Sequence, residues 1–413
     1  MRPLKLHKLR QEFPRERIED IEHVVRSQPA WQTIDLRPGA RIAVAVGSRG
    51  VANIGRIVKG TVAMLRERGA QPFIIPAMGS HGGATAKGQL RLLASFGITP
   101  ESVGCPIESS MDVVSLPGGE AGVELFMDRH AYETDGIVLI NRIKPHTDFH
   151  GQYESGLVKM SVIGLGKERQ AFEIHRHGVR GLKEFVPRAA KQILSTGKIL
   201  LGIGLVENAY EETMAIVAIP GGEIMEREPD LLELARRNMP RLPVDQLDVL
   251  IVDWLGKEIS GSGMDTNIIG RIRIRGETEP GTPDIKIIVV MDLTEQSHGN
   301  AAGTGLADVT TRRLFNKIDF AVTNKNVFTS SFFERGKIPV VAETDAQAME
   351  YALRACGAEA SERPRIIRIR DTLHLSEFYA SDAVVEELRE DKKAEVIARA
   401  RDLFDSSGNM AAF

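Results

Sequence analysis

Apolar runs that alternate with amphipathic segments constrain the fold of this chain more than any other feature. Residues Arg41–Gly47 (RIAVAVG) form a short apolar run that ends at glycine, which predicts a buried strand. Apolar residues recur at helical spacing over Asn53–Gly69, and Gln71–Pro76 (QPFIIP) is a second buried run. Strand, helix and strand in this order predict a parallel sheet with right-handed crossovers. The same pattern continues at Ala86–Phe96, Asp135–Asn141, Val179–Ser195 and Lys198–Leu205.

A second unit of the same kind is expected after Arg237–Gln246, a polar stretch in which two prolines interrupt the helical pattern. A chain of 413 residues is also too long for one ordinary core. We therefore predict an α/β fold of two domains, each a mostly parallel sheet flanked by helices, with the active site in the cleft between them. The first domain is placed at residues 1–240 and the second at 245–395. Whether the C-terminal segment, about residues 398–413, packs back onto the first domain is left open. The second domain is expected to contain strands at Asp248–Asp253, Asp284–Asp292, Ile338–Ala342 and Arg365–Ile369, and helices at Asp345–Cys356 and Asp382–Phe404.

Composition excludes several classes of function. The 53 basic and 56 acidic residues are well mixed and leave a net charge of −3, which gives no electrostatic basis for nucleic-acid binding. The two cysteines are far apart, so neither a disulfide framework nor a thiolate zinc site is expected. No stretch approaches the roughly 18 apolar residues that a membrane span requires. We expect a cytoplasmic protein that binds neither nucleic acid nor membrane.

Histidines gather in glycine-rich or turn-like segments, several of them directly after predicted strands. Ligands collect at the carboxyl ends of strands in open α/β sheets, because loops and helix N-termini converge there. Any one of these histidines could face solvent without a function, but their shared placement favours acid–base work near neutral pH or ligation of nickel or zinc. Two histidines of opposed orientation can exchange the roles of acid and base at one carbon. The six are His81, His146, His150, His175, His177 and His298.

Two other segments have open interpretations. Arg49 follows the first strand and could bind a carboxylate through its guanidinium group or lie on the surface. Ser48 and the glycines beside it could hold a phosphate ahead of the next helix. His146 and His150 have the spacing of a helical metal pair, but Pro145 and Gly151 flank them and make a helix doubtful.

Five segments, in order along the chain, carry a resemblance to a known family. They are GSRGVANIGR, PAMGSHGGAT, KPHTDFHG, SGLVK and FEIHRHG, with His175 sixteen residues after Lys159. The order of the segments and that interval resemble the nickel-dependent lactate racemases and their 2-hydroxy-acid racemase and epimerase relatives. The resemblance is strongest between Arg41 and Gly178.

This resemblance implies a nickel-pincer nucleotide, the nickel complex of pyridinium-3,5-bisthiocarboxylic acid mononucleotide, tethered through a thioamide to Lys159. It implies that His175 is the nickel ligand and that His81 and His146 are the catalytic acid–base pair. Arg49 would help to bind the cofactor or the substrate, and Ser48 would lie on the cofactor side. The implied activity is racemisation or epimerisation of a small 2-hydroxy acid by reversible hydride transfer. The implied partners are that substrate and the enzymes that synthesise the cofactor.

The chain also departs from the family pattern. The segment between the Pro-His pair and Lys159 is longer than in lactate racemases and adds His150. The substrate-binding glutamine and lysine of the second domain have only a loose counterpart in TEQSHGN. In this segment Gln296 matches the glutamine, but no lysine follows it, and His298 is present instead.

Two rival functions remain. One is a zinc- or iron-dependent lyase or dehydratase of sugar acids, with His146, His150 and His175 as ligands and Lys159 dispensable. The other is a non-catalytic protein that binds the nickel nucleotide, for which Lys159 and His175 matter while His81 and His146 do not. A nicotinamide dehydrogenase is disfavoured because the loop after the first strand reads GSRGVANIG and not GxGxxG.

Overall fold

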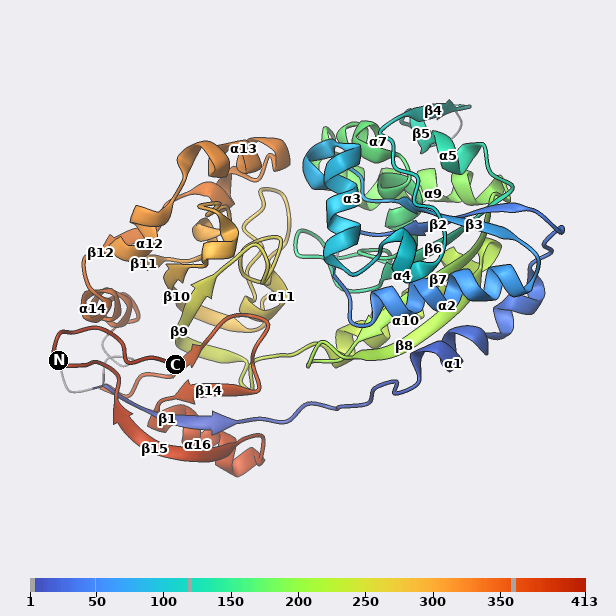
Figure 1. The fold of residues 1–413 in the computed structure, drawn as a ribbon. Coiled ribbons are helices and arrows are strands. Elements are labelled where there is room, and N and C mark those ends of the chain that lie inside the picture. Colours follow the sequence, from blue (N-terminus) through green and yellow to red (C-terminus); the bar gives the residue numbers. More distant parts are fainter. Residues whose placement is uncertain (1–3, 49, 118–120, 358–361) are drawn as a thin grey trace. The chain divides into compact units, whose positions relative to one another are not determined.

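A computed structural model describes the chain except for residues 1–3, 49, 118–120 and 358–361 (Figure 1). The described chain forms two compact units. The first unit is Arg15–Met239, and the second joins Met1–Pro14 to Pro240–Phe413. Each unit contains a sheet with parallel strands and flanking helices, so the predicted α/β class is confirmed.

The sheet of the first unit has five strands in the order β3-β2-β6-β7-β8. The first four are parallel and β8 is antiparallel to β7. Five successive residues of β2 are buried, as expected for a strand covered by helices on both faces. The strands are β2 (Arg41–Val46), β3 (Gln71–Pro76), β6 (Gly136–Arg142), β7 (Ile199–Glu207) and β8 (Thr213–Pro220).

Helices follow most of these strands, as the apolar spacing predicts. The predicted segment Val179–Ser195 is interrupted by a π-helical turn at Gly181–Phe185, and another such turn lies at Met160–Gly164. A two-stranded hairpin, β4 (Val113–Leu116) with β5 (Leu125–Asp128), lies outside the main sheet. The helices are α1 (Ile21–Arg26), α2 (Ile54–Glu67), α3 (Ala86–Ser95), α4 (Pro100–Val103), α5 (Arg129–Tyr132), α6 (Leu157–Lys159), α7 (Lys167–His175), α8 (Gly178–Arg180), α9 (Val186–Ser195) and α10 (Ile224–Asn238).

A glycine on β7 lets two helices approach the sheet closely. A Cβ atom at Gly202 would lie 2.7 Å from the Leu157 side chain of α6 and 2.9 Å from the Ile224 side chain of α10. Side chains on the other face of β7, including Leu201 and Ile203, join the core formed with α2. The absence of a side chain at Gly202 therefore brings α6 and α10 against the same face of the sheet.

The sheet of the second unit has eight strands in the order β12-β11-β10-β9-β13-β14-β1-β15. Its first five strands are parallel and its last three are antiparallel. The strands are β1 (Lys5–Arg10), β9 (Gln246–Leu255), β10 (Asp284–Leu293), β11 (Val309–Thr311), β12 (Val340–Ala342), β13 (Ile366–Ile369), β14 (Glu377–Ala380) and β15 (Glu395–Asp402), and the helices are α11 (Thr266–Ile269), α12 (Arg312–Lys317), α13 (Phe320–Ser330), α14 (Asp345–Ala355) and α16 (Asp382–Asp391).

The two ends of the chain differ from the sequence prediction. The predicted helix Asp382–Phe404 ends at Asp391, and Lys392 takes a left-handed backbone conformation with a φ of 53°. Residues Glu395–Asp402 then form β15, which pairs with β1. The C-terminal segment therefore belongs to the second unit and does not return to the first. The prediction that residues 1–14 belong to the first domain is wrong for the same reason, because β1 lies between β14 and β15.

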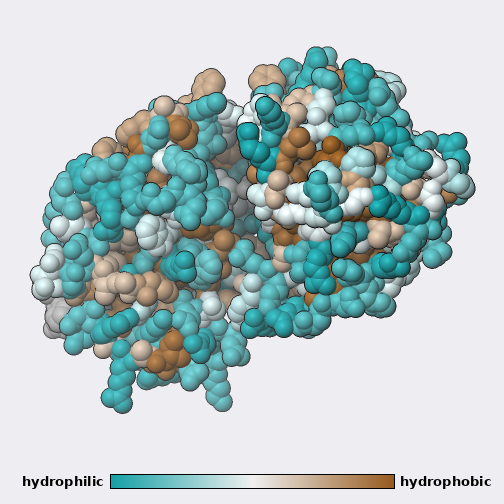
Figure 2. Space-filling view, in the orientation of Figure 1, coloured by the Kyte–Doolittle hydropathy of each residue, from teal (hydrophilic) through white to brown (hydrophobic). Residues whose placement is uncertain are grey.

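Hydrophilic side chains cover most of the face shown in Figure 2, and apolar side chains are scattered among them. Within the described part of the chain, no helix is long and apolar enough to cross a membrane.

Candidate active site

The predicted histidines of the first unit follow parallel strands of its sheet. His81 lies in the loop after β3, and His146 lies in the loop after β6. Parallel strands end at the same edge of a sheet, so these two loops leave the sheet on the same side. Lys159 ends α6 and His175 ends α7.

His146 and Lys159 are in direct contact. The Lys159 Nζ atom lies 2.5 Å from Nε2 of His146. The other ring nitrogen, Nδ1, accepts a hydrogen bond from the backbone N–H of Asp148 at 3.0 Å. A neutral imidazole with an accepting Nδ1 has its proton on Nε2. The contact therefore places the Lys159 amine directly against the Nε2 side of the His146 ring.

His81 has the opposite arrangement of its ring nitrogens. Its Nδ1 atom lies 2.8 Å from the carbonyl oxygen of Met78. A carbonyl oxygen can only accept, so the His81 proton lies on Nδ1 and the lone pair lies on Nε2. At Nε2, neutral His81 is therefore a proton acceptor and neutral His146 is a proton donor. The two neutral rings therefore have opposite tautomers, and either of them would need its imidazolium form to act as a general acid.

His175 belongs to the same cluster and is half-buried. Burial lowers its pKa to about 4, and the cationic forms of Lys159 and His81 act in the same direction while Asp148 opposes them. These effects require that His175 be near the three other groups. Its imidazole is neutral at pH 7, which is the form that binds a metal.

Glu154 organises the loop that contains His146. Its side chain is fully buried, and its two oxygens accept hydrogen bonds from the backbone N–H of His146 at 2.6 Å and of Gly151 at 3.0 Å. Arg236 of α10 contacts the same carboxylate at 2.5 Å. His150, the additional histidine of this loop, is exposed, and its Nδ1 lies 3.4 Å from Glu154. His150 therefore faces the loop's own carboxylate in this arrangement.

The Glu154 contacts predict an acid-sensitive contribution to stability. Burial alone would raise the pKa of Glu154, but hydrogen bonds from His150, His146 and Gly151, together with Arg236, hold the pKa below its usual value. A lowered folded-state pKa contributes stability that is present above the unfolded value of about 4.3 and is lost as pH falls through the folded value. Urea unfolding should show that Glu154→Gln loses less stability than the wild type between about pH 6 and pH 3. Glu226→Gln, at an exposed site on α10, should behave like the wild type; equal acid sensitivity in Glu154→Gln would contradict the assignment.

A buried lysine that sequence analysis missed supports the His81 loop. The side chain of Lys167 is fully buried, and its Nζ lies 2.9 Å from Asp128 Oδ2 and 3.3 Å from Gln89 Oε1. The Gln89 amide in turn donates to the carbonyl oxygens of Gly79 at 3.0 Å and His81 at 3.3 Å. Lys167 also has a φ of 56°, a strained value for a residue with a side chain. The strained, buried lysine thus connects α7 to the loop that contains His81.

Removal of the Lys167 charge should be strongly destabilising. Lys167→Met leaves the Asp128 carboxylate buried without its cation, and such a change typically costs about 3–5 kcal/mol of unfolding free energy. Adding Asp128→Asn should recover part of this loss, because an amide oxygen can still accept the hydrogen bond that Asp128 Oδ1 receives from the backbone N–H of Ala131. Urea unfolding of the single and double variants measures both effects. Equal stability of the two variants would show that the ion pair is not the cause.

The other predicted site residues are placed as follows. Ser48 is half-buried directly after β2, and Arg49 lies outside the described residues. Gln296 and His298 are exposed in the second unit, on the turn that follows β10, where His298 has a left-handed φ of 47°. His177 packs edge-on against the ring of Phe185. The roles of Ser48, Arg49, Gln296 and His298, and the predicted cleft, stay predictions.

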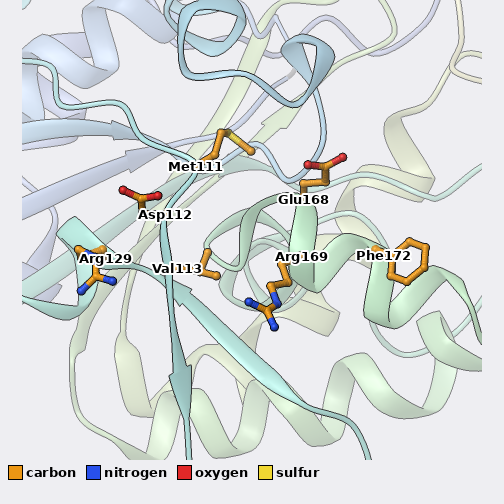
Figure 3. A pocket seen from close by; sticks show the side chains of 7 residues that line it. All are labelled: Met111, Asp112, Val113, Arg129, Glu168, Arg169 and Phe172. Carbon is orange, nitrogen blue, oxygen red and sulfur yellow. The ribbon is translucent and has the colours of Figure 1, made fainter.

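A separate pocket of about 510 Å³ lies beside α7 (Figure 3). Two arginines and one exposed aromatic ring contribute to its wall, but none of the predicted site residues does. The pocket therefore gives no support to the predicted chemistry. It is lined by Met111, Asp112, Val113, Arg129, Glu168, Arg169 and Phe172.

Comparison with known proteins identifies the fold. No family model matches the chain, and no curated protein matches it in sequence. Among solved structures, the lactate racemase apoprotein from Thermoanaerobacterium thermosaccharolyticum matches with a TM-score of 0.54 and 12% identity, over 89% of this chain and 98% of that one. The chain has a lactate racemase-like fold. This confirms the fold that the sequence resemblance implies. An identity of 12% assigns no function to individual residues, so their functions are argued from the contacts that they make in this chain.

The residues that support the site in this lactate racemase-like fold were missed by sequence analysis. Glu154, Lys167 and Gln89 are buried polar residues, and each has at least one partner distant in the chain: Arg236 contacts Glu154, and Lys167 contacts Gln89. The one local signal for Lys167 is its position directly after Gly166 in the segment GLGK. Burial of a lysine in such a segment is set by tertiary contacts, which the sequence pattern does not show.

Proposed function

We propose that this protein is a racemase or epimerase of a small 2-hydroxy acid that uses a nickel-pincer nucleotide tethered to Lys159. The observation that supports this proposal most directly is the complementary pair of histidines. Their hydrogen bonds give His81 a proton-accepting Nε2 and His146 a proton-donating Nε2, and both belong to the cluster with Lys159 and His175. The lactate racemase-like fold agrees with this proposal.

The side chains present fit the proposed cofactor. Lys159 presents a primary amine 2.5 Å from Nε2 of His146, and the neutral form of such an amine permits an acyl-type linkage. His175 presents a neutral imidazole, which suits nickel. Among the described residues, no three histidine, cysteine, aspartate or glutamate side chains form a group that could hold a metal by themselves. A metal held by His175 together with a bound nucleotide is therefore favoured over the rival site of His146, His150 and His175.

The chain's own residues supply the proton transfer in this proposal. When bound, the cofactor supplies a reversible acceptor for hydride. Neutral His81 accepts the hydroxyl proton of one enantiomer at Nε2, and His146, protonated on both ring nitrogens, returns a proton from its own Nε2 when the hydroxyl forms again on the opposite face. This step leaves His81 protonated and His146 neutral. The roles exchange for the other enantiomer. Arg49 and Ser48 would bind the substrate carboxylate and the cofactor phosphate, and Gln296 and His298 would contact the substrate from the second unit.

The activity is tested with protein co-expressed with the cofactor-synthesising enzymes and supplied with nickel. Single enantiomers of 2-hydroxy acids, from lactate to sugar acids, are incubated with this protein and followed by chiral chromatography. We expect inversion of configuration at the hydroxyl-bearing carbon of at least one substrate. Loss of water from a sugar acid with zinc or iron bound would establish the lyase instead. A firmly bound nucleotide with no turnover of any substrate would establish the non-catalytic binding protein.

A further inference from the structure

Helix α10 contacts both the loop of His146 and the helix that ends at Lys159. We propose that α10 is the positioning element for His146 and Lys159, and that Glu228, Arg236 and the backbone carbonyl of Met225 are its three anchoring points. This inference rests on the functions proposed above for His146 and Lys159. None of the three anchors is assigned contact with the substrate or the cofactor.

The first anchor is Glu228, a residue of α10 whose side chain contacts the start of α6. Its fully buried carboxylate accepts a hydrogen bond from the backbone N–H of Val158 at 2.8 Å, directly before Lys159. Burial raises the pKa of Glu228 to about 7, although the backbone N–H groups of Val158 and Leu157 lower it. A Cβ atom at Gly156 would lie 2.5 Å from this carboxyl group, so only glycine leaves it room. Glu228 therefore satisfies backbone donors at a helix start that has no capping side chain of its own.

The second anchor is Arg236, two helical turns after Glu228. Its Nη2 atom donates to Glu154 Oε1 at 2.5 Å and to the carbonyl oxygen of Gly151 at 3.1 Å. Glu154 in turn accepts from the backbone N–H of His146. Arg236 thus reaches His146 through one buried carboxylate.

The third anchor arises from a proline inside α10. Pro229 has no N–H, so the carbonyl oxygen of Met225, four residues earlier, lacks its helical donor. The hydroxyl of Tyr153 donates to this oxygen at 2.9 Å. Tyr153 lies next to Glu154, in the loop that contains His146. The proline therefore provides an acceptor that the loop uses.

The three anchors together give a structural use to a proline and a buried carboxylate within one helix. Interior proline and a buried, partly protonated glutamate each destabilise a helix that has no use for them. Here each provides a partner for the segment between His146 and Lys159. The loop thus takes its conformation from α10 as well as from the strand that precedes it.

Hydrogen exchange tests the Arg236 anchor without cofactor or substrate. Arg236→Met should speed exchange in peptides that cover residues 146–155 by about tenfold, the factor that corresponds to 1.4 kcal/mol. Arg237→Met is the matched control, because Arg237 is exposed on the same helix and contacts Glu233. Arg237→Met should leave exchange in these peptides unchanged. Equal rates in the two variants would overturn this part of the proposal.

The proline anchor is tested by a double-mutant cycle. Tyr153→Phe should speed exchange in the same peptides, because the Met225 carbonyl loses its donor. Pro229→Ala restores an N–H at residue 229, so Tyr153→Phe should have a much smaller effect in that background. The same effect in both backgrounds would show that the proline does not create the contact.

The Glu228 anchor is tested by the reactivity of Lys159. Native protein is treated briefly with an amine-acylating reagent, and mass spectrometry compares labelling of Lys159 with that of Lys191, an exposed lysine on α9. Glu228→Leu should change the ratio several-fold, and Glu228→Gln, which keeps an accepting oxygen, should restore it. A general loss of stability would not produce this selective rescue. If Glu228→Leu does not fold, Gly156→Ala, which crowds the same carboxyl group, should change the ratio; an unchanged ratio in every folded variant would overturn the proposal.

These measurements separate the inference from the proposed function. If α10 controls exchange and labelling but no 2-hydroxy acid is inverted, the positioning stands and the racemase proposal fails. If racemisation is found but exchange and labelling do not respond to the anchors, the racemase proposal stands and the positioning fails.

Discussion

Lys159→Ala is expected to abolish covalent attachment of the nickel-pincer nucleotide. The wild-type protein, co-expressed with the cofactor-synthesising enzymes, should show an intact mass increased by one nucleotide, and Lys159→Ala should show the mass of the unmodified chain. The physical reason is that Lys159 supplies the primary amine that lies against His146 in the site. The neutral form of this amine can attack the carbon of a thiocarboxyl group, and a thioamide forms when the thiocarboxyl oxygen leaves as water.

Two further variants sharpen this result. Lys159→Arg keeps a long cationic side chain but removes the primary amine, so it should also lack the added mass. Lys191→Ala, at an exposed site on α9, should retain the added mass. Racemisation by a protein of unmodified mass, at the wild-type rate, would contradict the assignment of Lys159. A mass increase that persists in Lys159→Ala would place the attachment elsewhere.

Local sequence pattern predicted most of the elements that position the site. The strands that precede His81 and His146 are short apolar runs, and such runs form buried parallel strands because helices cover both faces of the sheet. The ends of the chain were mispredicted because β15 exists through its pairing with β1, nearly the whole chain length away. Residues Glu395–Asp402 continue a helical pattern locally, and only long-range pairing decides their conformation.

Local sequence likewise predicted one part of the site, while another part depends on long-range contacts. Histidines after parallel strands could be predicted to converge, because strand ends converge. The groups that orient these histidines could not, since Glu154, Lys167 and Glu228 are charged residues whose burial depends on partners far away in sequence. Charged residues are usually exposed, so the sequence alone favours the wrong environment for all three. Pro229 is similar: its effect depends on Tyr153, which only the fold brings near.

His81→Ala and His146→Ala are each expected to reduce turnover by roughly 10²–10⁴-fold, the usual contribution of a general acid–base group. Inversion needs one group that takes a proton and another that returns it, so loss of either should slow the reaction from both enantiomers. The structure gives the two histidines opposite ring tautomers through Met78 and Asp148. In each single variant, the histidine that remains should therefore not take over the role of the one removed.

The bound metal distinguishes this effect from loss of the cofactor. Nickel content and the added nucleotide mass should survive in both variants, because neither histidine is assigned as a ligand, whereas His175→Ala should lose nickel. His177→Ala is the matched control, since this histidine packs against Phe185 and has no assigned role. It should retain most of the turnover. Full activity of His81→Ala or His146→Ala with nickel bound would remove that histidine from the acid–base pair, because no proton could then pass through it.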